Sequence, residues 1–531
     1  MIGKMKIQNA LSNPNVNGLI DGSIDIANLS KAFPVEDMEL RSGKVKVNMV
    51  INANSDDIIN QNYQAMKLSG ELDTKDIDVT YGPWPIKIIE SKTKLNPKTV
   101  TASVVDMRVG ESDFNGNINL QDPLALIQDS TISVSTKIDL RSKYLNADEL
   151  ITLNDNTESK SGTPESSVSD LYNKYNVSGS YTAQNIKYKE YDLAKLNSKF
   201  EYSEDAIKIK STDFLLDKSS VSMRGEASNI MDYITRNEEI SGKLFLEADK
   251  INLDNYITAD NASDVKEGAF VIEKNMDLLI YPEVNQLTYG KYVLNEVEGK
   301  VEIKDGMALL KEGITKTLGG KINLDGLYDT SDPSKPVFDI RYKLDQLSYQ
   351  KLFGISETFK KLAPITKYIE GAFNSTLVMA GPLTEEMLPD LTKVTATGFL
   401  ETLKGEVQGF EPIERIGNAI GVDKLKKWTL EGTKNWFDVK DGFVILKPHD
   451  HHIDDMVFTV AGNHGIDQTL DYKINAKIPR DKLRKDKLGK NIEFGLEYLE
   501  KEATSRGVNI CLLYTSPSPR DATLSRMPSS A

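Results

Sequence analysis

Residues 44–51, KVKVNMVI, alternate between polar and apolar side chains. An extended chain turns successive side chains to opposite sides, so a period of two predicts a β-strand with one apolar face. The apolar face of this strand would hold Val45, Val47, Met49 and Ile51, and the opposite face Lys44, Lys46 and Asn48. This stretch predicts a sheet with one polar and one apolar side, not one buried on both.

The same alternation recurs along the chain, notably over Ile132–Leu140 and Asp471–Ile478. We therefore expect a mainly β protein: an elongated, curved, antiparallel β-sheet groove built from repeats, with a few short helices toward the C-terminus. The predicted apolar lining comprises Val45, Val47, Met49, Ile51, Ile132, Val134, Ile138, Ile207, Ile209, Tyr472 and Ile474.

The strands repeat in a fixed order, which is typical of repeat architectures. A hairpin with a polar turn occurs over 200–210, 301–310 and 437–447, with an earlier copy turning at Asn96-Pro97. Each hairpin is followed by a strand that contains a glycine. From the N-terminus, these glycines are Gly116 after the turn at Asn96-Pro97, then Gly225, Gly320 and Gly462. A further strand then ends in a short apolar segment, and residues 23–33 match the end of a copy that would begin before Met1. We expect the natural protein to extend upstream.

Helical spacing of apolar residues is confined to a few segments: Tyr349–Phe373, broken near Pro364, then Glu411–Lys427 and Pro479–Gly507. These helices are too few to cover so many one-sided strands. The apolar faces must therefore cover one another, or line a groove whose contents come from elsewhere.

These observations divide the chain into five parts. They are repeats over 1–150 with a truncated first copy, a polar loop over 151–170, repeats over 171–353, a C-terminal region with helices and a hairpin over 354–510, and a tail over 511–531. The tail resembles translated sequencing-adapter read-through and is set aside.

Composition excludes several functions. The 531 residues carry 65 Lys+Arg against 79 Asp+Glu, a net charge of −14, and no basic block, which argues against nucleic acid as a partner. The only cysteine lies in the tail, so thiol catalysis and disulfides are not expected in residues 1–510. Neither a membrane-spanning helix nor a signal peptide is predicted, and no phosphate loop or nucleophile elbow occurs. We expect no catalytic residue and no cofactor.

One cluster could carry chemistry. Residues 447–455, KPHDHHIDD, place His449, His451 and His452 beside aspartates, and His464 follows. Imidazoles and carboxylates suit a divalent metal, and His449 and His451 would share one face of a strand. The alternative is a polar strand end beside a turn, in which case no metal is held.

The region from Gly371 to Ile510 resembles the C-terminal region of AsmA-like proteins. The matching features are the strand ending at Gly381, the apolar helix around Ile416 and Leu425, the Lys-Asp-Gly hairpin, Lys447-Pro448, and Gly462 with Asp467-Gln468-Thr469. The upstream repeats are similar to the β-groove repeats of the wider AsmA and TamB group. The resemblance implies a periplasmic protein of the diderm cell envelope, anchored in the inner membrane by an N-terminal helix that this chain lacks.

The resemblance further implies a non-enzymatic protein that carries phospholipid between the inner and outer membranes and supports outer-membrane assembly. A wall of alternating strands would hold acyl chains on its apolar face, because each methylene kept from water gains about 0.8 kcal/mol. Two other hypotheses stay open at this point. One is a structural or adhesive β-repeat protein with a dry core, and the other is a metal-dependent hydrolase at His449–His452.

Overall fold

A computed structural model describes residues 2–9, 14–27, 38–60, 66–82, 84–123, 134–150, 175–189, 191–256, 271–384, 388–420, 422–467, 469–479 and 508–515. The fold is mainly β, as predicted, with 25 strands and a few short helices among these residues. No helix in these ranges is long and apolar enough to cross a membrane. The chain divides into two compact units, and β14 (Met276–Tyr289) and β15 (Tyr292–Lys304) contribute residues to both.

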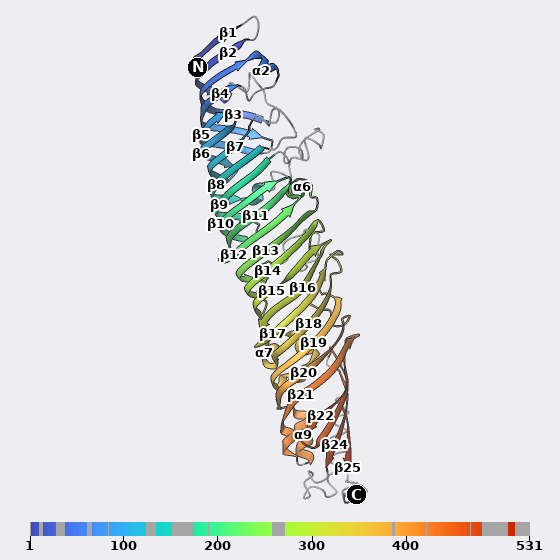
Figure 1. The fold of residues 1–531 in the computed structure, drawn as a ribbon. Coiled ribbons are helices and arrows are strands. Elements are labelled where there is room, and N and C mark those ends of the chain that lie inside the picture. The colour runs from blue at the N-terminus through green and yellow to red at the C-terminus, as the bar shows by residue number, and fades with distance from the viewer. Residues whose placement is uncertain are drawn as a thin grey trace, which may run out of the picture. The chain divides into compact units, whose positions relative to one another are not determined.

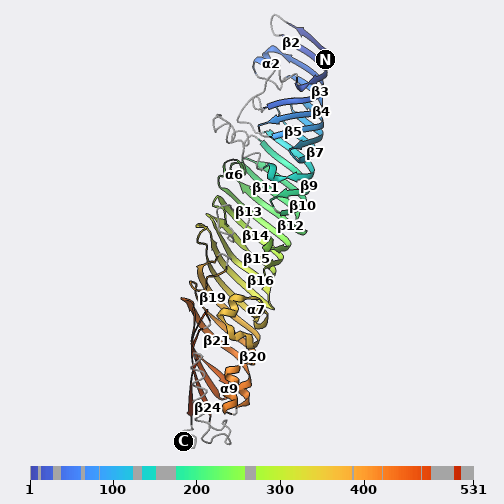
Figure 2. The ribbon, with the colours of Figure 1, turned by 180° about the vertical axis from the view of Figure 1, so that it is seen from behind.

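Unit 1 is a curved sheet whose strands follow one another in chain order (Figures 1 and 2). Its strands are β1 (Ile2–Gln8), β2 (Asn15–Asp25), β3 (Met38–Asn54), β4 (Lys67–Tyr81), β5 (Trp84–Asn96), β6 (Thr99–Val109), β7 (Ser112–Gln121), β8 (Val134–Asn146), β9 (Tyr175–Tyr188), β10 (Tyr191–Ser203), β11 (Ala206–Leu216), β12 (Ser219–Ser228) and β13 (Ile240–Asn252). Two short helices, α2 (Ser55–Ile59) and α6 (Ile230–Arg236), follow the ends of β3 and β12.

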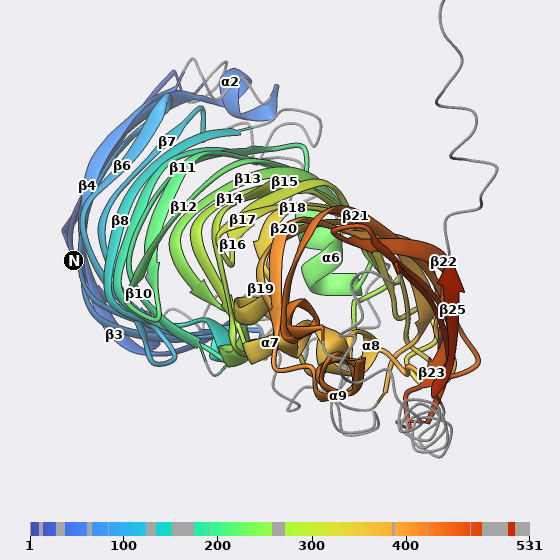
Figure 3. The same cartoon turned by 90° about the horizontal axis from the view of Figure 1, so that it is seen from below.

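Unit 2 continues the strand order with β16 (Met307–Thr317), β17 (Gly320–Asp329), β18 (Val337–Ser348), β19 (Ile369–Pro382), β20 (Thr395–Gln408), β21 (Lys427–Lys440), β22 (Phe443–Ile453), β23 (Met456–Gly465), β24 (Leu470–Pro479) and β25 (Val508–Thr515). It also holds η2 (Leu253–Asn255), α7 (Tyr349–Ile355), α8 (Glu357–Leu362), η3 (Pro364–Tyr368), α9 (Glu411–Ile420) and η4 (Asp423–Lys426). Figure 3 shows α7, α8 and α9 inside the curve of the unit 2 strands.

Pairing is antiparallel nearly throughout, but two pairs are parallel, which corrects the expectation of a purely antiparallel sheet. They are β8 with β9 and β24 with β25. A parallel neighbour needs a connection of a dozen or more residues, and long segments of chain separate the two strands in both cases. The predicted polar loop over 151–170 belongs to the first connection and lies outside the described residues, as do residues 480–507 of the predicted last helix.

Two of the three predicted helical segments, Tyr349–Phe373 and Glu411–Lys427, contain helices, and residues 480–507 of the third lie outside the described residues. The segment Tyr349–Phe373 forms α7 and α8, divided at Ser356, whose hydroxyl accepts a hydrogen bond from the Phe359 backbone N–H at 3.1 Å. Pro364 begins a 3-10 turn, and Ile369–Phe373 belongs to strand β19. The first residues of the tail that was set aside, Cys511–Thr515, lie in β25, which pairs with β24.

The repeating sequence motif corresponds to four successive strands: β5 to β8, β10 to β13, β15 to β18 and β21 to β24. The Asp-Gly turns work as predicted, because Asp305 and Gly306 both have positive φ, 52° and 80°. This geometry is that of a type I′ turn, whose twist matches the flanking strands. The second strand of each motif carries a β-bulge opposite the glycine-containing strand, as between Ile209 and Thr212. Bulges bend a strand and increase its twist, so the repeat builds curvature into the sheet.

The glycine of the motif is required by a close approach of two backbones. Gly225 has φ of 150°, and a Cβ placed on it would lie 2.1 Å from the carbonyl oxygen of Lys243 on β13. Gly116 and Gly462 have nearly the same φ, 150° and 145°, and meet the next strand in the same way. Any other residue there would force two strands apart, which explains why glycine recurs.

We predict that Gly225→Ala lowers the free energy of unfolding by about 3 kcal/mol, from backbone strain and the clash with Lys243. Gly18→Ala is the matched control, because a Cβ there would meet no atom closer than 4.0 Å. Urea denaturation followed by circular dichroism measures both. Equal stability of the two variants would contradict this role of the motif glycine.

Candidate functional site

The apolar face of unit 1 carries two rows of paired residues that cross the sheet from β2 to β13. The first row contains Gly22, Val47, Leu72, Thr93, Ala102, Ile118, Ile138, Gly179, Phe200, Ile209, Gly225 and Leu244. The second contains Ile20, Met49, Gly70, Leu95, Val100, Leu120, Thr136, Val177, Tyr202, Ile207, Ala227 and Gly242. None of these residues is charged. We call the two rows together the uncharged strip.

The residues between these rows belong to the opposite face, and they are all polar. In strand order they are Asp21, Asn48, Glu71, Lys94, Thr101, Asn119, Lys137, Ser178, Glu201, Lys208, Glu226 and Lys243. Neighbours on this face form ion pairs, such as Lys94 with Glu71 at 3.1 Å. A slip of one residue in register would exchange the two faces, so the alternation itself holds the strands in register.

The strip is long compared with any one lipid tail. Strands β2 to β13 are separated by eleven spacings of about 4.8 Å, so the strip runs for about 50 Å across the strands of unit 1. One leaflet of a bilayer's hydrocarbon core is about 15 Å thick. The strip is therefore about three times as long as such a tail, and an acyl chain on it could move about twice its own length without meeting a charged side chain.

The side chains of the strip are mostly of intermediate exposure, and Val47 is only 6% exposed. Among the described residues, unit 1 has one small buried cluster, of Ile26, Ile77 and Val79, to one side of the strip. No residue of the strip belongs to a buried cluster of the described residues. Part of its apolar surface is therefore exposed in the described part of the chain.

Eight of the eleven predicted lining residues lie on this face of unit 1. Val47, Met49, Ile138, Ile207 and Ile209 belong to the strip itself. Beside it, Val45 pairs with Ile24 and Thr74, Ile51 pairs with Gly18 and Leu68, and Val134 pairs with Tyr175. Ile132 lies outside the described residues.

The other two predicted residues lie in unit 2, where helices cover the sheet. Ile474 packs against a buried cluster formed by Ile413, Val422, Leu425, Ile453, Met456, Phe458 and Ala476, which joins α9 and η4 to β22, β23 and β24. The hydroxyl of Tyr472 hydrogen-bonds His464 Nδ1 at 2.8 Å, and burial raises the pKa of Tyr472 to about 12. The local sequence pattern of β24 resembles that of β3, but its apolar side is a packed core.

Aromatic side chains fill the apolar face of unit 2 near α7. The Tyr349 ring is fully buried and stacks on Phe373 at 4.5 Å between centroids, and Phe359 of α8 stacks on the same ring at 5.8 Å. The Tyr349 hydroxyl and Thr402 Oγ1 share a hydrogen bond of 2.7 Å. These contacts satisfy the buried polar groups and leave this part of the face closed.

The histidine cluster is divided between two faces of β22. His449 and His451 share the apolar side, as predicted, and their Nε2 atoms are 2.7 Å apart. Asp450 and His452 are exposed on the other side, and Asp450 accepts a hydrogen bond from the Thr459 hydroxyl at 2.5 Å. Across the described ranges no group of three or more His, Cys, Asp or Glu side chains is placed to hold a metal. The two imidazoles are thus not joined by the carboxylates that the sequence places beside them.

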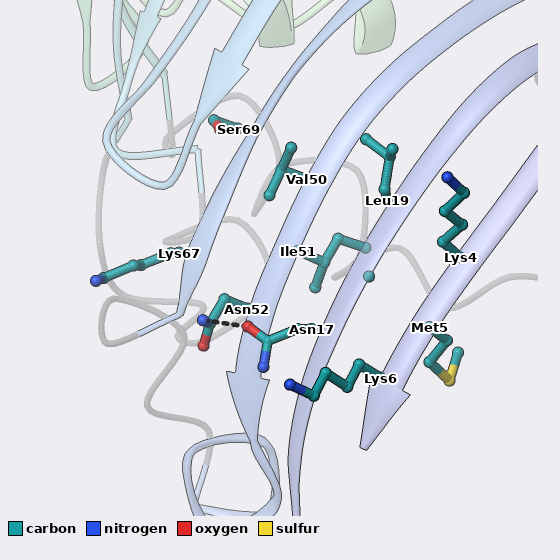
Figure 4. A pocket seen from close by; sticks show the side chains of 11 residues that line it. Lys4, Met5, Lys6, Asn17, Leu19, Val50, Ile51, Asn52, Lys67 and Ser69 are labelled. Atoms are coloured by element: carbon teal, nitrogen blue, oxygen red, sulfur yellow. Dashed lines mark hydrogen bonds between the residues drawn. The ribbon is translucent and has the colours of Figure 1, made fainter. Parts of the chain in front are cut away.

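One surface was missed by the sequence analysis. A hollow of about 530 Å³ on the polar face of β1 to β4 is lined by residues that include Lys4, Lys6, Leu19, Val50 and Lys67 (Figure 4). The apolar members interrupt a face that is otherwise polar. In the sequence, only the two lysines of Lys4-Met5-Lys6 indicate a basic surface here. Lys67 joins the same surface through the pairing of strands β1 to β4.

Comparisons of this chain with protein-family models, with curated proteins and with solved structures find no match.

Replacing a side chain by alanine should change the free energy of unfolding differently on the two apolar faces, the packed face of unit 2 and the partly exposed strip of unit 1. Leu425→Ala should lower the free energy of unfolding by about 2 to 5 kcal/mol, because this side chain is 0% exposed and its loss leaves a cavity. Ile138→Ala should cost less, about 1 to 2 kcal/mol, since this side chain is of intermediate exposure and part of it is already in water. Thermal or urea denaturation of each variant measures the difference. Equal losses would show that the strip is packed as tightly as unit 2.

Burial and, to a lesser degree, the neighbouring His449 lower the pKa of His451 to about 4. The unfolded value is near 6.5, so between these two pH values the unfolded chain binds a proton that the folded chain does not. This contribution to stability is complete above pH 6.5 and is lost as the pH falls toward 4. We predict that His451→Gln reduces the loss of unfolding free energy between pH 7 and pH 4.5 by about 2 kcal/mol. An unchanged pH dependence of urea denaturation would contradict this.

Proposed function

We propose that this protein is a non-enzymatic protein of the diderm cell envelope that binds lipid acyl chains along the uncharged strip. In this proposal it acts in the periplasm, where it supports phospholipid transport between the inner and outer membranes and so outer-membrane assembly. The observation that carries the proposal is the pair of rows from β2 to β13, which are uncharged, partly exposed and continuous across the strands of unit 1.

The energetics favour an acyl chain as the ligand. A chain of about 16 carbons loses on the order of 10 kcal/mol when it enters water, at about 0.8 kcal/mol per methylene. Contact with the strip removes part of that cost, and it also covers side chains such as Ile138 and Phe200 that are otherwise partly exposed. The strip offers no hydrogen-bonding cage or charge to fix one lipid in place, which suits movement along it.

The headgroup would stay in water. A phosphate on the strip would be desolvated with no lysine or arginine beside it, and an unpaired charge is expensive to bury. The lipid would therefore lie with its tails on the apolar face and its headgroup directed away from the sheet. This arrangement discriminates little between headgroups, so we expect binding of several phospholipids with similar tails.

A structural role is the second candidate, and one observation favours it for unit 2. Three buried clusters of described residues fill the apolar side of that unit, including the fully buried Tyr349, Phe373 and Leu425. This unit has the dry core that a structural repeat protein would have. The metal-dependent hydrolase has no comparable support, because His449 and His451 face away from the nearby aspartates.

The test is lipid mass spectrometry on the full chain, purified without detergent from the periplasm of a diderm host. Val47→Asp with Ile138→Asp puts two charges on the strip. The matched control is Asn48→Asp with Lys137→Asp, which changes the adjoining residues of the same strands on the polar face. We expect phospholipid to co-purify with the wild type and the control, and to fall at least tenfold in the strip variant.

Two results would contradict the proposal. One is a folded wild-type protein that carries no lipid, which would favour the structural role over lipid binding. The other is equal lipid content in the strip variant and the control. Circular dichroism of each preparation establishes that the strands are formed, so loss of lipid is separated from loss of fold.

A further inference from the structure

The hollow on the polar face of β1 to β4 combines cationic and apolar side chains in register. One row consists of Lys6, Asn17, Asn52 and Lys67, and the next consists of Lys4, Leu19, Val50 and Ser69. Asn52 donates a hydrogen bond to Asn17 at 2.5 Å, which ties the middle of the first row together. The lysines therefore stand at the ends of two rows whose centre is uncharged (Figure 4).

The three lysines form no ion pair within the described part of the chain. Some lysines elsewhere on the same face are paired with carboxylates, as Lys94 is with Glu71 at 3.1 Å. The adjoining row of the polar face holds two carboxylates, Asp21 and Glu71. Glu71 forms the ion pair with Lys94. A protein with net charge −14 thus presents a local excess of positive charge at this surface.

The apolar residues of the hollow are exposed although they lie on the polar face. Leu19 is 38% and Val50 is 48% exposed, and they pair directly with each other across β2 and β3. Exposed apolar residues beside long lysines form a surface that suits a boundary between water and hydrocarbon.

We propose that the hollow formed by Lys4, Lys6, Leu19, Val50 and Lys67 docks on the surface of a membrane that contains anionic lipids. The ammonium groups would meet the phosphate layer, and Leu19 and Val50 would enter the headgroup boundary. The lysines are spread over strands β1 to β4, three spacings or about 14 Å, which fits a layer of headgroups better than one small anion. A free phosphate would make no use of the apolar centre. The docking surface lies on the opposite face from the uncharged strip and does not depend on lipid binding there.

The test is flotation of the full chain with vesicles of phosphatidylcholine, with and without about a third of phosphatidylglycerol. One variant is Lys4→Gln, Lys6→Gln, Lys67→Gln. Its matched control, Lys46→Gln, Lys137→Gln, Lys199→Gln, removes the same charge from exposed lysines of β3, β8 and β10. A lysine near an anionic surface is worth about a fivefold change in affinity, so the hollow variant should bind on the order of 100-fold more weakly.

Wild type and control should bind the anionic vesicles alike and bind neutral vesicles weakly, with affinity falling as salt rises. A second variant, Leu19→Thr with Val50→Thr, should weaken binding while leaving the salt dependence in place. The proposal is overturned if wild type ignores anionic vesicles, if both lysine triples lose affinity equally, or if millimolar inorganic phosphate displaces the protein, which would indicate a soluble anion as the ligand. The Val47→Asp, Ile138→Asp protein should still float, so failure of docking and failure of the strip are distinguishable.

Discussion

Backbone pairing between successive strands is the constraint on which the rest of this structure depends, because it decides which side chains share a face. In unit 1 the pairing holds register through the bulges, so that Val47, Ile118 and Ile209 fall in one row although they are far apart in sequence. The residues between them fall in a polar row on the other side. A continuous uncharged surface follows from this pairing without any residue dedicated to binding.

Alternation along single strands was enough to predict the fold class and the face on which most lining residues lie. Val45, Val47 and Met49 alternate with polar residues, and a half-buried strand follows from that period. The continuity of the rows could not be predicted, because it depends on register shifts such as the one between Ala102 and Val105. The hollow could not be predicted either, since Lys67 and Lys6 fall in one row only through the pairing of four strands.

The same local pattern has two outcomes in this chain, and packing decides between them. Ile207 and Ile474 both alternate with polar neighbours, but only Ile474 is covered, by the cluster that includes Leu425 of η4. The helix and 3-10 turn that follow β20 supply that cover, and no residue of the strip belongs to a buried cluster of the described residues. Alternation of apolar and polar residues along a strand identifies its apolar face. Whether other parts of the chain pack on that face depends on elements that are distant in sequence. This difference separates a surface open to ligand from a surface that stabilises the fold.

The most direct test of the central claim is photo-crosslinking at successive positions of β3 in the cell envelope, followed by mass spectrometry of the lipid adducts. A photoreactive residue would replace each of residues 44 to 49 in turn. The account predicts far more adducts of lipid tails at Val45, Val47 and Met49 than at Lys44, Lys46 and Asn48, because only the first three belong to the uncharged strip or adjoin it. Adducts at all six positions alike, or at none, would contradict the claim that lipid lies on one face of the sheet.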